Sequence, residues 1–166
     1  MTFARDEARL RALASRLERE TTATVDLLKA DLTASDELAR VEARLREDHR
    51  IGILVNNAGA AAHGSFADPD LDATERLIRL NVTALTRLAG AVIPRYLQQG
   101  GGAIVNLASV LALVPEFPMG AYGATKAYVL ALSQNLQSEL GSRGIYVQAV
   151  QPNFFNTRPA ERYLTG

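Results

Sequence analysis

Residues 51–59 read Ile-Gly-Ile-Leu-Val-Asn-Asn-Ala-Gly, and this stretch decides the fold. Its first five residues form a continuous apolar run, which predicts a strand buried on both faces, as in a parallel sheet. The run stops at Asn56, and the small and polar residues up to Gly59 are typical of a turn at a strand end. Further strands are expected over 24–28, 103–107 and 145–150.

Helical patterns separate these runs. Apolar residues recur at helical spacing over residues 5–20, and Ser35 is expected to cap a second helix. A long amphipathic segment opens at Asp70 or Asp72 and is expected to be disturbed at Pro94. A last helix covers 121–140 and is closed by Gly141. Strands that alternate with helices predict an α/β fold with a doubly wound parallel sheet, in one domain over residues 1–166.

Composition excludes several classes of function. The 166 residues carry a formal net charge of zero, so no global field favours nucleic acid or a membrane surface. Cysteine is absent, which rules out disulfides, thiolate metal sites and a cysteine nucleophile. His49 and His63 stand alone, so no metal site is expected. The longest apolar stretch, residues 103–114, is too short to span a bilayer, and we expect a cytoplasmic protein.

Tyr122 and Lys126 carry the clearest chemical signal. Residues four apart on a helix share a face, so the ammonium group can lower the pKa of the phenol. A shift from about 10 to about 7 needs roughly 4 kcal/mol, and a nearby charge in a partly dry site can supply it. The pair therefore predicts a general acid and base, with an unrelated Tyr and Lys as the alternative.

Other informative residues follow the expected strands. Ligands in doubly wound sheets bind beyond the carboxyl ends of the strands. Polar or small residues occur at that position after each strand, namely Asp31, Asn56 to Gly59, Ser109, and Pro152 to Thr157.

The order and spacing of these motifs resemble the short-chain dehydrogenase/reductase family. The matching motifs are Asp31-Leu-Thr33, Asn56-Asn-Ala-Gly59, Asn81-Val82, Ser109, Tyr122-x-x-x-Lys126 and Pro152-x-x-x-x-Thr157. The resemblance implies a Rossmann-like fold and reversible hydride transfer between a nicotinamide cofactor and a carbonyl compound or secondary alcohol.

The resemblance also implies four catalytic residues. Tyr122 would be the acid and base, and Lys126 would support it and bind the nicotinamide ribose. Ser109 would hold the substrate oxygen, although a lone Ser after a strand is commonly a turn or cap residue. Asn81 would organise a water that relays protons to Lys126, with a polar residue on the helix surface as the alternative.

Cofactor contacts are implied in the same way. Arg5 would pair with the 2′-phosphate of NADP, NAD being possible, or would be a surface cation. Asp31 would lie near the adenine ring or serve as a helix-entry residue. The turn over 57–59 would bind the cofactor or hold the central sheet together. The full set of expected contacts is Arg5, Asp31, Asn57, Ala58, Gly59, Tyr122, Lys126, Pro152 and Thr157.

The chain departs from the family pattern at three places. The family's opening strand and glycine-rich phosphate turn would precede Thr2, and no such turn occurs among the 12 glycines. Loss of that central strand would leave a gap and an unpaired edge. Asn153 replaces a usual Gly, and the sequence stops at Gly166. We expect a family member truncated at both ends, from a shortened reading frame or as a genuine short protein.

Two hypotheses about function remain open. The first is an NADP-dependent oxidoreductase acting on a small carbonyl or alcohol substrate. The apolar residues after Ser109 would form a wall of the substrate pocket or would belong to ordinary packing; they are Leu111, Leu113, Val114 and Phe117. The second is an inactive remnant that pairs with full-length relatives. The family resemblance implies homo-oligomers through the helices at 81–97 and 122–140, which would serve either hypothesis.

Overall fold

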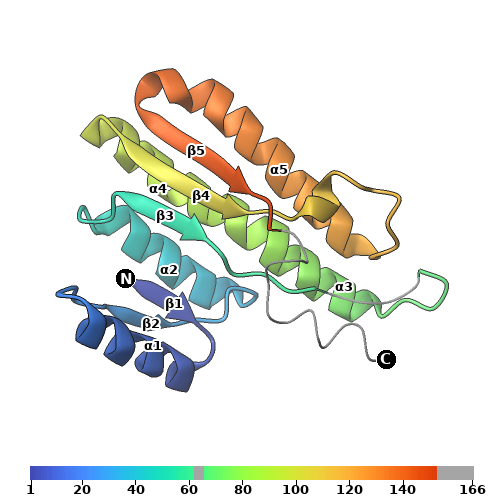
Figure 1. The fold of residues 1–166 in the computed structure, drawn as a ribbon, viewed down its shortest axis with the longest axis horizontal. Coiled ribbons are helices and arrows are strands. Elements are labelled where there is room, and N and C mark those ends of the chain that lie inside the picture. Colours follow the sequence, from blue (N-terminus) through green and yellow to red (C-terminus); the bar gives the residue numbers. More distant parts are fainter. Residues whose placement is uncertain (62–65, 153–166) are drawn as a thin grey trace.

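A computed structural model describes residues 1–61 and 66–152, in which strands and helices alternate (Figure 1). The strands are β1 (Thr2–Ala4), β2 (Leu27–Lys29), β3 (Ile53–Asn56), β4 (Gly102–Leu107) and β5 (Ile145–Val150). The helices are α1 (Glu7–Glu20), α2 (Ser35–Glu47), α3 (Leu71–Ile78), the π-helical η1 (Arg79–Ala84), α4 (Leu85–Gln99) and α5 (Ala121–Leu140). Short 3-10 turns occur at η2 (Val110–Ala112) and η3 (Gly141–Arg143).

The strands form two parallel groups that lie side by side (Figure 1). β1 pairs with β2, with Phe3 opposite Leu28. β3 pairs with β4, which pairs with β5. Within the described residues, β1 and β3 are neighbours that share no ladder. The prediction of an α/β fold with a parallel sheet is confirmed, and so is the expected gap with unpaired strand edges.

The expectation that β3 is buried on both faces is wrong. Leu54 and Asn56 are 3% and 5% exposed, but Ile53 and Val55 are 63% and 52% exposed. Side chains alternate between the faces of a strand. The helices α4 and α5 cover only the face that carries Leu54 and Asn56 (Figure 1), so the apolar run is half buried.

The main core lies between the sheet and helices α2 and α4. Its largest buried side chain is Tyr96, and a Cβ built on Gly102 would lie 2.3 Å from the Tyr96 ring. Glu42 on α2 binds the guanidinium of Arg87 on α4. Arg95, also on α4, donates hydrogen bonds to the carbonyl of Leu45 in the last turn of α2 and to that of Ile51 before β3, and these contacts hold α2, α4 and β3 together.

Buried amides tie β3, β4 and α5 into one unit. Asn56 donates to the Asn106 side chain over 2.9 Å, and Asn106 donates to the Ser133 hydroxyl over 2.9 Å. Ser133 in turn donates to the carbonyl of Val129 one turn earlier. Buried polar groups need such partners, so this chain of amides positions the carboxyl ends of β3 and β4 relative to α5.

Two local expectations need correction, and a third is confirmed. Ser35 is the first residue of α2, and the cap position is Ala34, whose side chain makes no capping bond. Pro94 lies inside α4 and does not end it, because the neighbouring residues Val92 and Tyr96 are fully buried in the core. The expectation that Gly141 closes α5 is confirmed, since the helix ends at Leu140 and Gly141 is its C-cap. Gly141 keeps a right-handed helical backbone, and the left-handed residue that reverses the chain is Gly144, with φ of 86°.

The continuous helical segment Leu71–Gln99 meets the length and composition of a membrane span, with 44% of its most apolar window buried inside the molecule. Core helices of globular proteins meet the same criteria. Here the buried positions of α4 belong to the main hydrophobic core, so this segment has the properties of a core helix.

Candidate functional site

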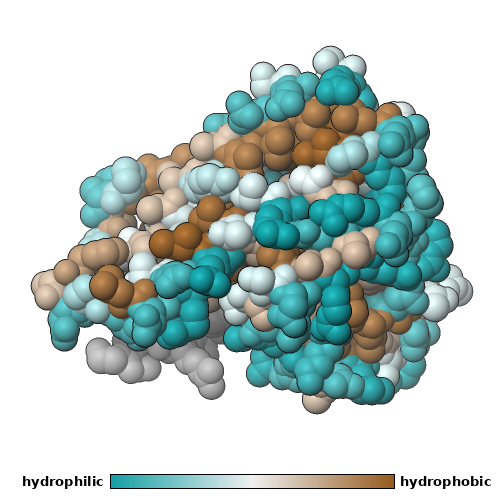
Figure 2. Space-filling model, turned by 180° about the vertical axis from the view of Figure 1, so that it is seen from behind, coloured by the Kyte–Doolittle hydropathy of each residue, from teal (hydrophilic) through white to brown (hydrophobic). Residues whose placement is uncertain are grey.

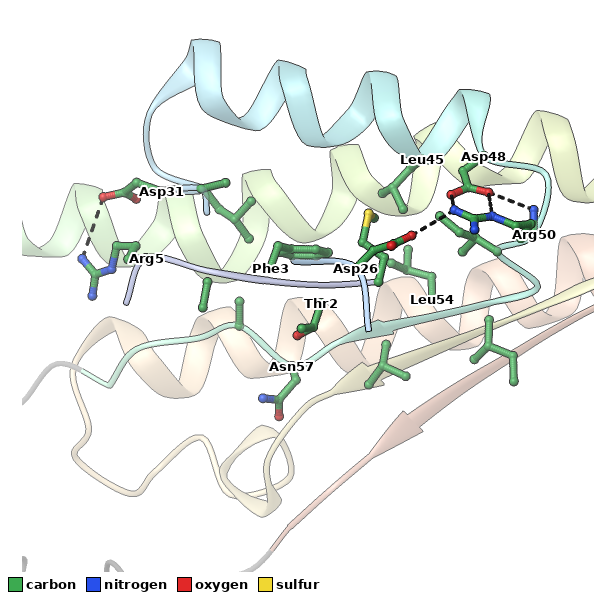
Figure 3. Close-up of a pocket in the computed structure, with 18 of the residues that line it drawn as sticks. Thr2, Phe3, Arg5, Asp26, Asp31, Leu45, Asp48, Arg50, Leu54 and Asn57 are labelled. Atoms are coloured by element: carbon green, nitrogen blue, oxygen red, sulfur yellow. Dashed lines mark hydrogen bonds and ion pairs between the residues drawn. The ribbon is translucent and has the colours of Figure 1, made fainter. Parts of the chain in front are cut away.

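A cavity of about 800 Å³ runs between the two strand groups. Its walls come from β1 and β3, with apolar side chains such as Phe3 and Leu54 between charged groups at either end (Figure 3). Arg5, Asp31 and Asn57 lie at the end where the strands finish. Ligands of parallel sheets bind beyond the carboxyl ends of strands, so that end is the candidate cofactor site.

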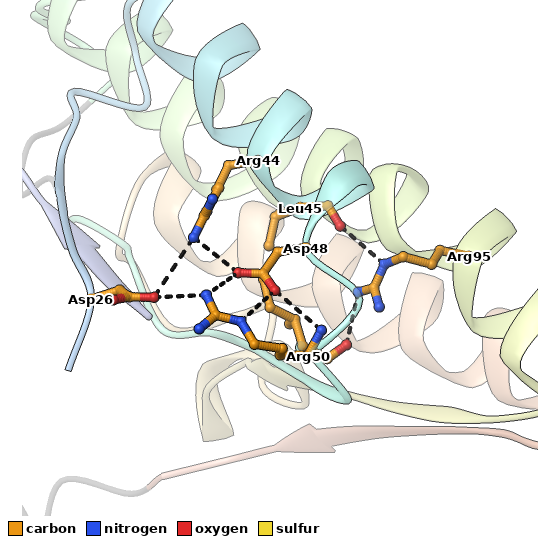
Figure 4. Close-up of polar contacts among 7 residues, drawn as sticks. Asp26, Arg44, Leu45, Asp48, Arg50 and Arg95 are labelled. Carbon is orange, nitrogen blue, oxygen red and sulfur yellow. Dashed lines mark hydrogen bonds and ion pairs between the residues drawn. The ribbon is translucent and has the colours of Figure 1, made fainter. Parts of the chain in front are cut away.

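The opposite end of the cavity carries an ionic cluster (Figure 4). The guanidinium of Arg50 donates to Asp48 over 2.7 Å and to Asp26 over 2.9 Å, and Arg44 contacts both carboxylates. The hydrogen bonds from Arg50 hold the pKa of Asp48 well below its usual range. Asp26 precedes β2 and Asp48 follows α2, so the cluster connects the two strand groups.

Arg5 and Asp31 meet at the carboxyl edge. The hydroxyl and the N–H of Thr33 both donate to Asp31, over 2.7 and 2.9 Å, and this turn leads into α2. These bonds, chiefly from the hydroxyl, lower the pKa of Asp31. Arg5 lies 3.9 Å from the second carboxylate oxygen and its side chain is 74% exposed. Asp31 is thus a helix-entry residue by geometry, and Arg5 presents a free face of its guanidinium beside it.

Asn81 is buried, with 1% exposure, in the π-helical segment η1. Its amide oxygen accepts from the N–H of Ala60, and its amide nitrogen donates to the Ala60 carbonyl, both over 2.9 Å. The same nitrogen donates to the Thr125 hydroxyl over 3.1 Å. The surface alternative is therefore wrong. The side chain clamps the loop after β3 to α5.

Gly59 and Lys126 lie against this clamp. A Cβ built on Gly59 would come within 3.3 Å of the Asn81 amide oxygen and 3.6 Å of the Lys126 nitrogen. Lys126 is only 7% exposed, and its ammonium donates to the Leu107 carbonyl over 2.6 Å. Burial lowers the pKa of Lys126. The absence of a side chain at Gly59 is what lets this loop approach both groups.

Tyr122 opens the first turn of α5, and the Lys126 ammonium lies 5.8 Å from the centre of its ring. The predicted proximity of the pair is therefore present. Ser109 follows β4 and is 6% exposed, and its hydroxyl oxygen accepts from the N–H of Leu111. Ser109 thus caps η2, as its alternative role as a cap residue predicts, and within the described residues its hydroxyl donates no hydrogen bond.

The residues of the turn after β3 line the cavity, while the residue before them is buried in the sheet. Asn56 is buried and holds the sheet. The exposed residues Asn57, Ala58 and Gly59 line the cavity. Pro152 is exposed and its carbonyl accepts from the N–H of Val110, whereas Thr157 lies outside the described residues.

One residue of the site, Thr125, was not predicted from the sequence. Thr125 is 4% exposed and joins Asn81 to the backbone carbonyl of Tyr122, to which it donates over 2.8 Å. Its place between Tyr122 and Lys126 was visible in the sequence. No helical pattern could indicate that its hydroxyl reaches a side chain from η1.

The chain is similar to known proteins over most of its length. The sequence model of the short chain dehydrogenase family matches residues 1–164. An uncharacterised oxidoreductase of Staphylococcus saprophyticus is 31% identical over 92% of this chain and 66% of its own length. The very-long-chain 3-oxoacyl-CoA reductase of Bos taurus is 32% identical over 96% of this chain and 52% of its own length.

Two solved structures are more similar still. A short-chain dehydrogenase from Sphingobium yanoikuyae in complex with NADPH is 60% identical, with a TM-score of 0.88 over 91% of this chain and 59% of its own. The bulky-bulky ketone specific alcohol dehydrogenase from Comamonas testosteroni is 55% identical, with a TM-score of 0.88 over 91% of this chain and 60% of its own. The chain spans about 60% of the length of these two proteins.

The fold and the site define a Rossmann-like, nicotinamide-cofactor class of protein. The chain belongs to the short-chain dehydrogenase/reductase family, whose members act on small-molecule substrates.

Proposed function

We propose that the protein is an NADP(H)-dependent oxidoreductase that interconverts a ketone and a secondary alcohol. The observation that carries the proposal is the convergence of Gly59, Asn81 and Lys126 beside Tyr122 at the carboxyl end of the parallel sheet. These residues come from three separate segments: Gly59 follows β3, Asn81 is buried in η1, and Tyr122 and Lys126 belong to α5. A merely structural Tyr and Lys pair would not require a glycine from the loop after β3 and a buried amide from η1 around it.

The residues fit a nicotinamide cofactor. The exposed guanidinium of Arg5 suits a 2′-phosphate, because a planar fork with several donors matches phosphate geometry. The cavity between Asp31 and the turn at 57–59 gives room beside it. When bound, the cofactor supplies the hydride.

The chain's own residues supply the proton and the electrostatics. Tyr122 gives a proton to the substrate oxygen in reduction and takes it back in oxidation. The ammonium of Lys126 stabilises the negative charge that develops on the phenol oxygen. Asn81 and Thr125 keep α5 and the loop after β3 in place, and Ser109 donates its hydroxyl proton to the substrate oxygen.

The substrate we propose is a bulky apolar ketone. Leu113 and Phe117, in the segment between η2 and α5, are 57% and 52% exposed, so they present apolar surface close to Ser109 and Tyr122 in the chain. Leu111 is 3% exposed and belongs to ordinary packing. The similarity to an alcohol dehydrogenase specific for bulky ketones supports the same substrate class.

Replacement of one phenol tests this function. Tyr122→Phe should abolish NADPH-dependent reduction of a bulky aryl ketone and leave NADPH binding, followed by nucleotide fluorescence, largely unchanged. Tyr128→Phe is the matched control, because Tyr128 is 40% exposed on the same helix and its hydroxyl contacts Thr86. Turnover that persists in Tyr122→Phe would overturn the assignment.

We also propose a cytoplasmic homo-oligomer that pairs through the surfaces of α4 and α5. Figure 2 views the face opposite to that of Figure 1, and hydrophobic side chains gather on its upper part, over α5. The same surface would serve the second function, pairing with longer relatives without catalysis. Sedimentation of the purified chain tests the pairing, and dimers that bind no NADPH would favour that second function.

A further inference from the structure

The backbone at the start of helix α5 has a conformation that glycine adopts far more readily than other residues. Gly120 precedes α5 with φ of 53° and ψ of −137°, a region that L-residues with a side chain avoid. Helices α1 and α3 begin differently, since Asp6 and Asp70 have extended backbone and their carboxylates accept from an N–H of the first turn. Gly120 has no side chain that could cap α5, so this glycine serves the backbone conformation and not capping.

The conformation of Gly120 forms a tight turn directly before Tyr122. The N–H of Tyr122 donates to the Met119 carbonyl over 3.1 Å, which closes a four-residue turn with Gly120 at its second position. A positive φ at that position is characteristic of a type II′ turn, in which glycine dominates. The same bond gives a partner to one of the N–H groups that a helix leaves unpaired in its first turn. The turn therefore fixes how Tyr122 enters α5.

The peptide groups on both sides of Tyr122 are held by hydrogen bonds. Its N–H is bound to Met119, and its carbonyl accepts from the Thr125 hydroxyl over 2.8 Å. Thr125 in turn accepts from the buried amide of Asn81. The direction of a side chain follows from its backbone, and the Lys126 ammonium lies 5.8 Å from the centre of the Tyr122 ring. The place of the phenol relative to Lys126 thus depends on the turn as well as on the helix.

The segment before the turn connects Tyr122 with exposed apolar surface. The N–H of Phe117 donates to the Val114 carbonyl over 3.0 Å, and the N–H of Met119 donates to the Phe117 carbonyl over 2.9 Å. Consecutive short turns therefore lead from Val114 to Tyr122, with the exposed side chain of Phe117 between them. A rotation about the backbone of Gly120 would move Tyr122 relative to this segment, because it displaces all atoms on one side of the rotated bond.

We propose that Gly120 is a positioning residue for Tyr122, which directs the phenol toward the reacting oxygen through the backbone conformation of the turn. The inference rests on the proposed oxidoreductase function, in which Tyr122 transfers the proton. A proton donor has to lie about 2.6–3.2 Å from its acceptor, and a displacement of about 1 Å can cost roughly 100-fold in rate. An L-residue with a side chain at position 120 favours negative φ, and the phenol then leaves its catalytic position.

Two alanine variants at positive φ separate positioning from stability. Gly100 at the end of α4 has φ of 78°, and among the described residues a Cβ built there would meet nothing within 4 Å. Gly100→Ala is therefore the matched control for Gly120→Ala, and both should unfold at lower urea concentration than the wild-type chain. Only Gly120→Ala should lower kcat for reduction of a bulky aryl ketone, by at least about tenfold, with KM for NADPH changed by less than about twofold.

Inverting the chirality of the added residue tests the role of the backbone directly. By mirror symmetry a D-residue favours positive φ, so D-alanine at position 120 adds the same methyl group and keeps the turn. The protein can be assembled by chemical ligation at Gly102–Ala103 and Gly123–Ala124, with a cysteine at each ligated alanine that is then desulfurised to alanine. The natural chain contains no cysteine, so this treatment changes no other residue. The kcat of the D-alanine protein should lie within about threefold of the wild-type value.

A readout without cofactor or turnover keeps this inference separate from the proposed function. The charge of Lys126 acts on the nearby phenol, so the pH at which Tyr122 ionises reports the relative position of the two groups. NMR of ring-labelled tyrosine, with Tyr122→Phe to assign the resonance, measures this pH. It should be the same in the wild-type chain, in Gly100→Ala and in the D-alanine protein, and it should change in Gly120→Ala.

The outcomes are distinct. A lower kcat and a changed ionisation of Tyr122 in Gly120→Ala, with neither effect in Gly100→Ala or in the D-alanine protein, support the proposal. An equal loss of kcat in Gly100→Ala or in the D-alanine protein overturns it, and so does an unchanged ionisation of Tyr122 in Gly120→Ala. If the wild-type chain reduces no ketone, the proposed function fails, and the ionisation of Tyr122 alone decides the role of Gly120.

Discussion

Removal of the Asn81 amide should destabilise the protein by about 3 kcal/mol. The side chain is 1% exposed and makes three hydrogen bonds, two to Ala60 and one to Thr125. A neutral hydrogen bond contributes about 0.5–1.5 kcal/mol net, and a buried group left without its partner costs more. Asn81→Ala removes all three bonds and leaves the Ala60 backbone groups to find other partners.

Equilibrium unfolding in urea measures this loss. With a slope of about 1–3 kcal/mol/M, the midpoint of Asn81→Ala should fall by about 1–3 M at unchanged slope. Thr125→Val removes one of the three bonds, and also the bond to Tyr122, and should cost about 1–2 kcal/mol. Asn135→Ala, at an exposed position on α5, is the control and should stay within about 0.5 kcal/mol.

A loss below about 0.5 kcal/mol in Asn81→Ala would refute the clamp. The Ala60 groups would then be satisfied without the amide, and the geometry of the loop after β3 would have another origin. If Asn81→Ala and Thr125→Val lose the same free energy, the two bonds to Ala60 contribute no more than the single bond from Thr125 to Tyr122.

Four further predictions follow from single contacts. Gly102→Ala should lose about 1–3 kcal/mol, because its Cβ would meet the Tyr96 ring at 2.3 Å, while Gly52→Ala, with nothing within 4 Å, should be neutral or stabilised in the same urea assay. The pKa of Asp48 is lowered in the folded state, so its contribution to the free energy of unfolding is present above about pH 4 and is lost as the pH falls through its folded-state pKa. The free energy of unfolding of Asp48→Asn should therefore fall less steeply with acidification than that of the wild-type chain. Equal slopes for the two proteins would count against the ionic cluster. Burial also lowers the pKa of Lys126, so the unfolded chain binds more protons than the folded chain as the pH approaches about 10.4, and the stability of the wild-type chain should rise with pH toward that value. Lys126→Met should lack this rise. Parallel curves of unfolding free energy against pH for the two proteins would contradict the prediction. Gly59→Ala should weaken NADPH-dependent turnover more than Gly90→Ala, since only the first places a Cβ against Asn81 and Lys126, and equal effects would argue against this packing.

Much of the fold followed from sequence periodicity. The bounds of α5 and β5 agree with the predicted 121–140 and 145–150, because both have strong patterns and clear glycine boundaries. Pro94 misled the prediction, since burial of Val92 and Tyr96 outweighs the local cost of proline. β3 misled it too, because an apolar run does not reveal that helices cover only one of its faces.

The sequence allowed us to predict which residues belong to the candidate site, but not how they contact one another. Spacing and resemblance selected Tyr122, Lys126 and Asn81, and the structure brings these residues together around Gly59. The bonds of Asn81 to Ala60 and Thr125 join segments far apart in the chain. Such pairing depends on three-dimensional packing, which one sequence does not encode in any local pattern. The role of Thr157 stays a prediction.

Transfer of a labelled hydride is the most direct test of the proposed chemistry. The purified chain is incubated with NADPH that carries deuterium at the transferable position and with a bulky aryl ketone, and the alcohol is analysed by mass spectrometry. The wild-type chain and Tyr128→Phe should give alcohol with one deuterium on the carbinol carbon, and Tyr122→Phe should give none. Labelled alcohol from Tyr122→Phe, or no labelled alcohol from the wild-type chain, would contradict the account.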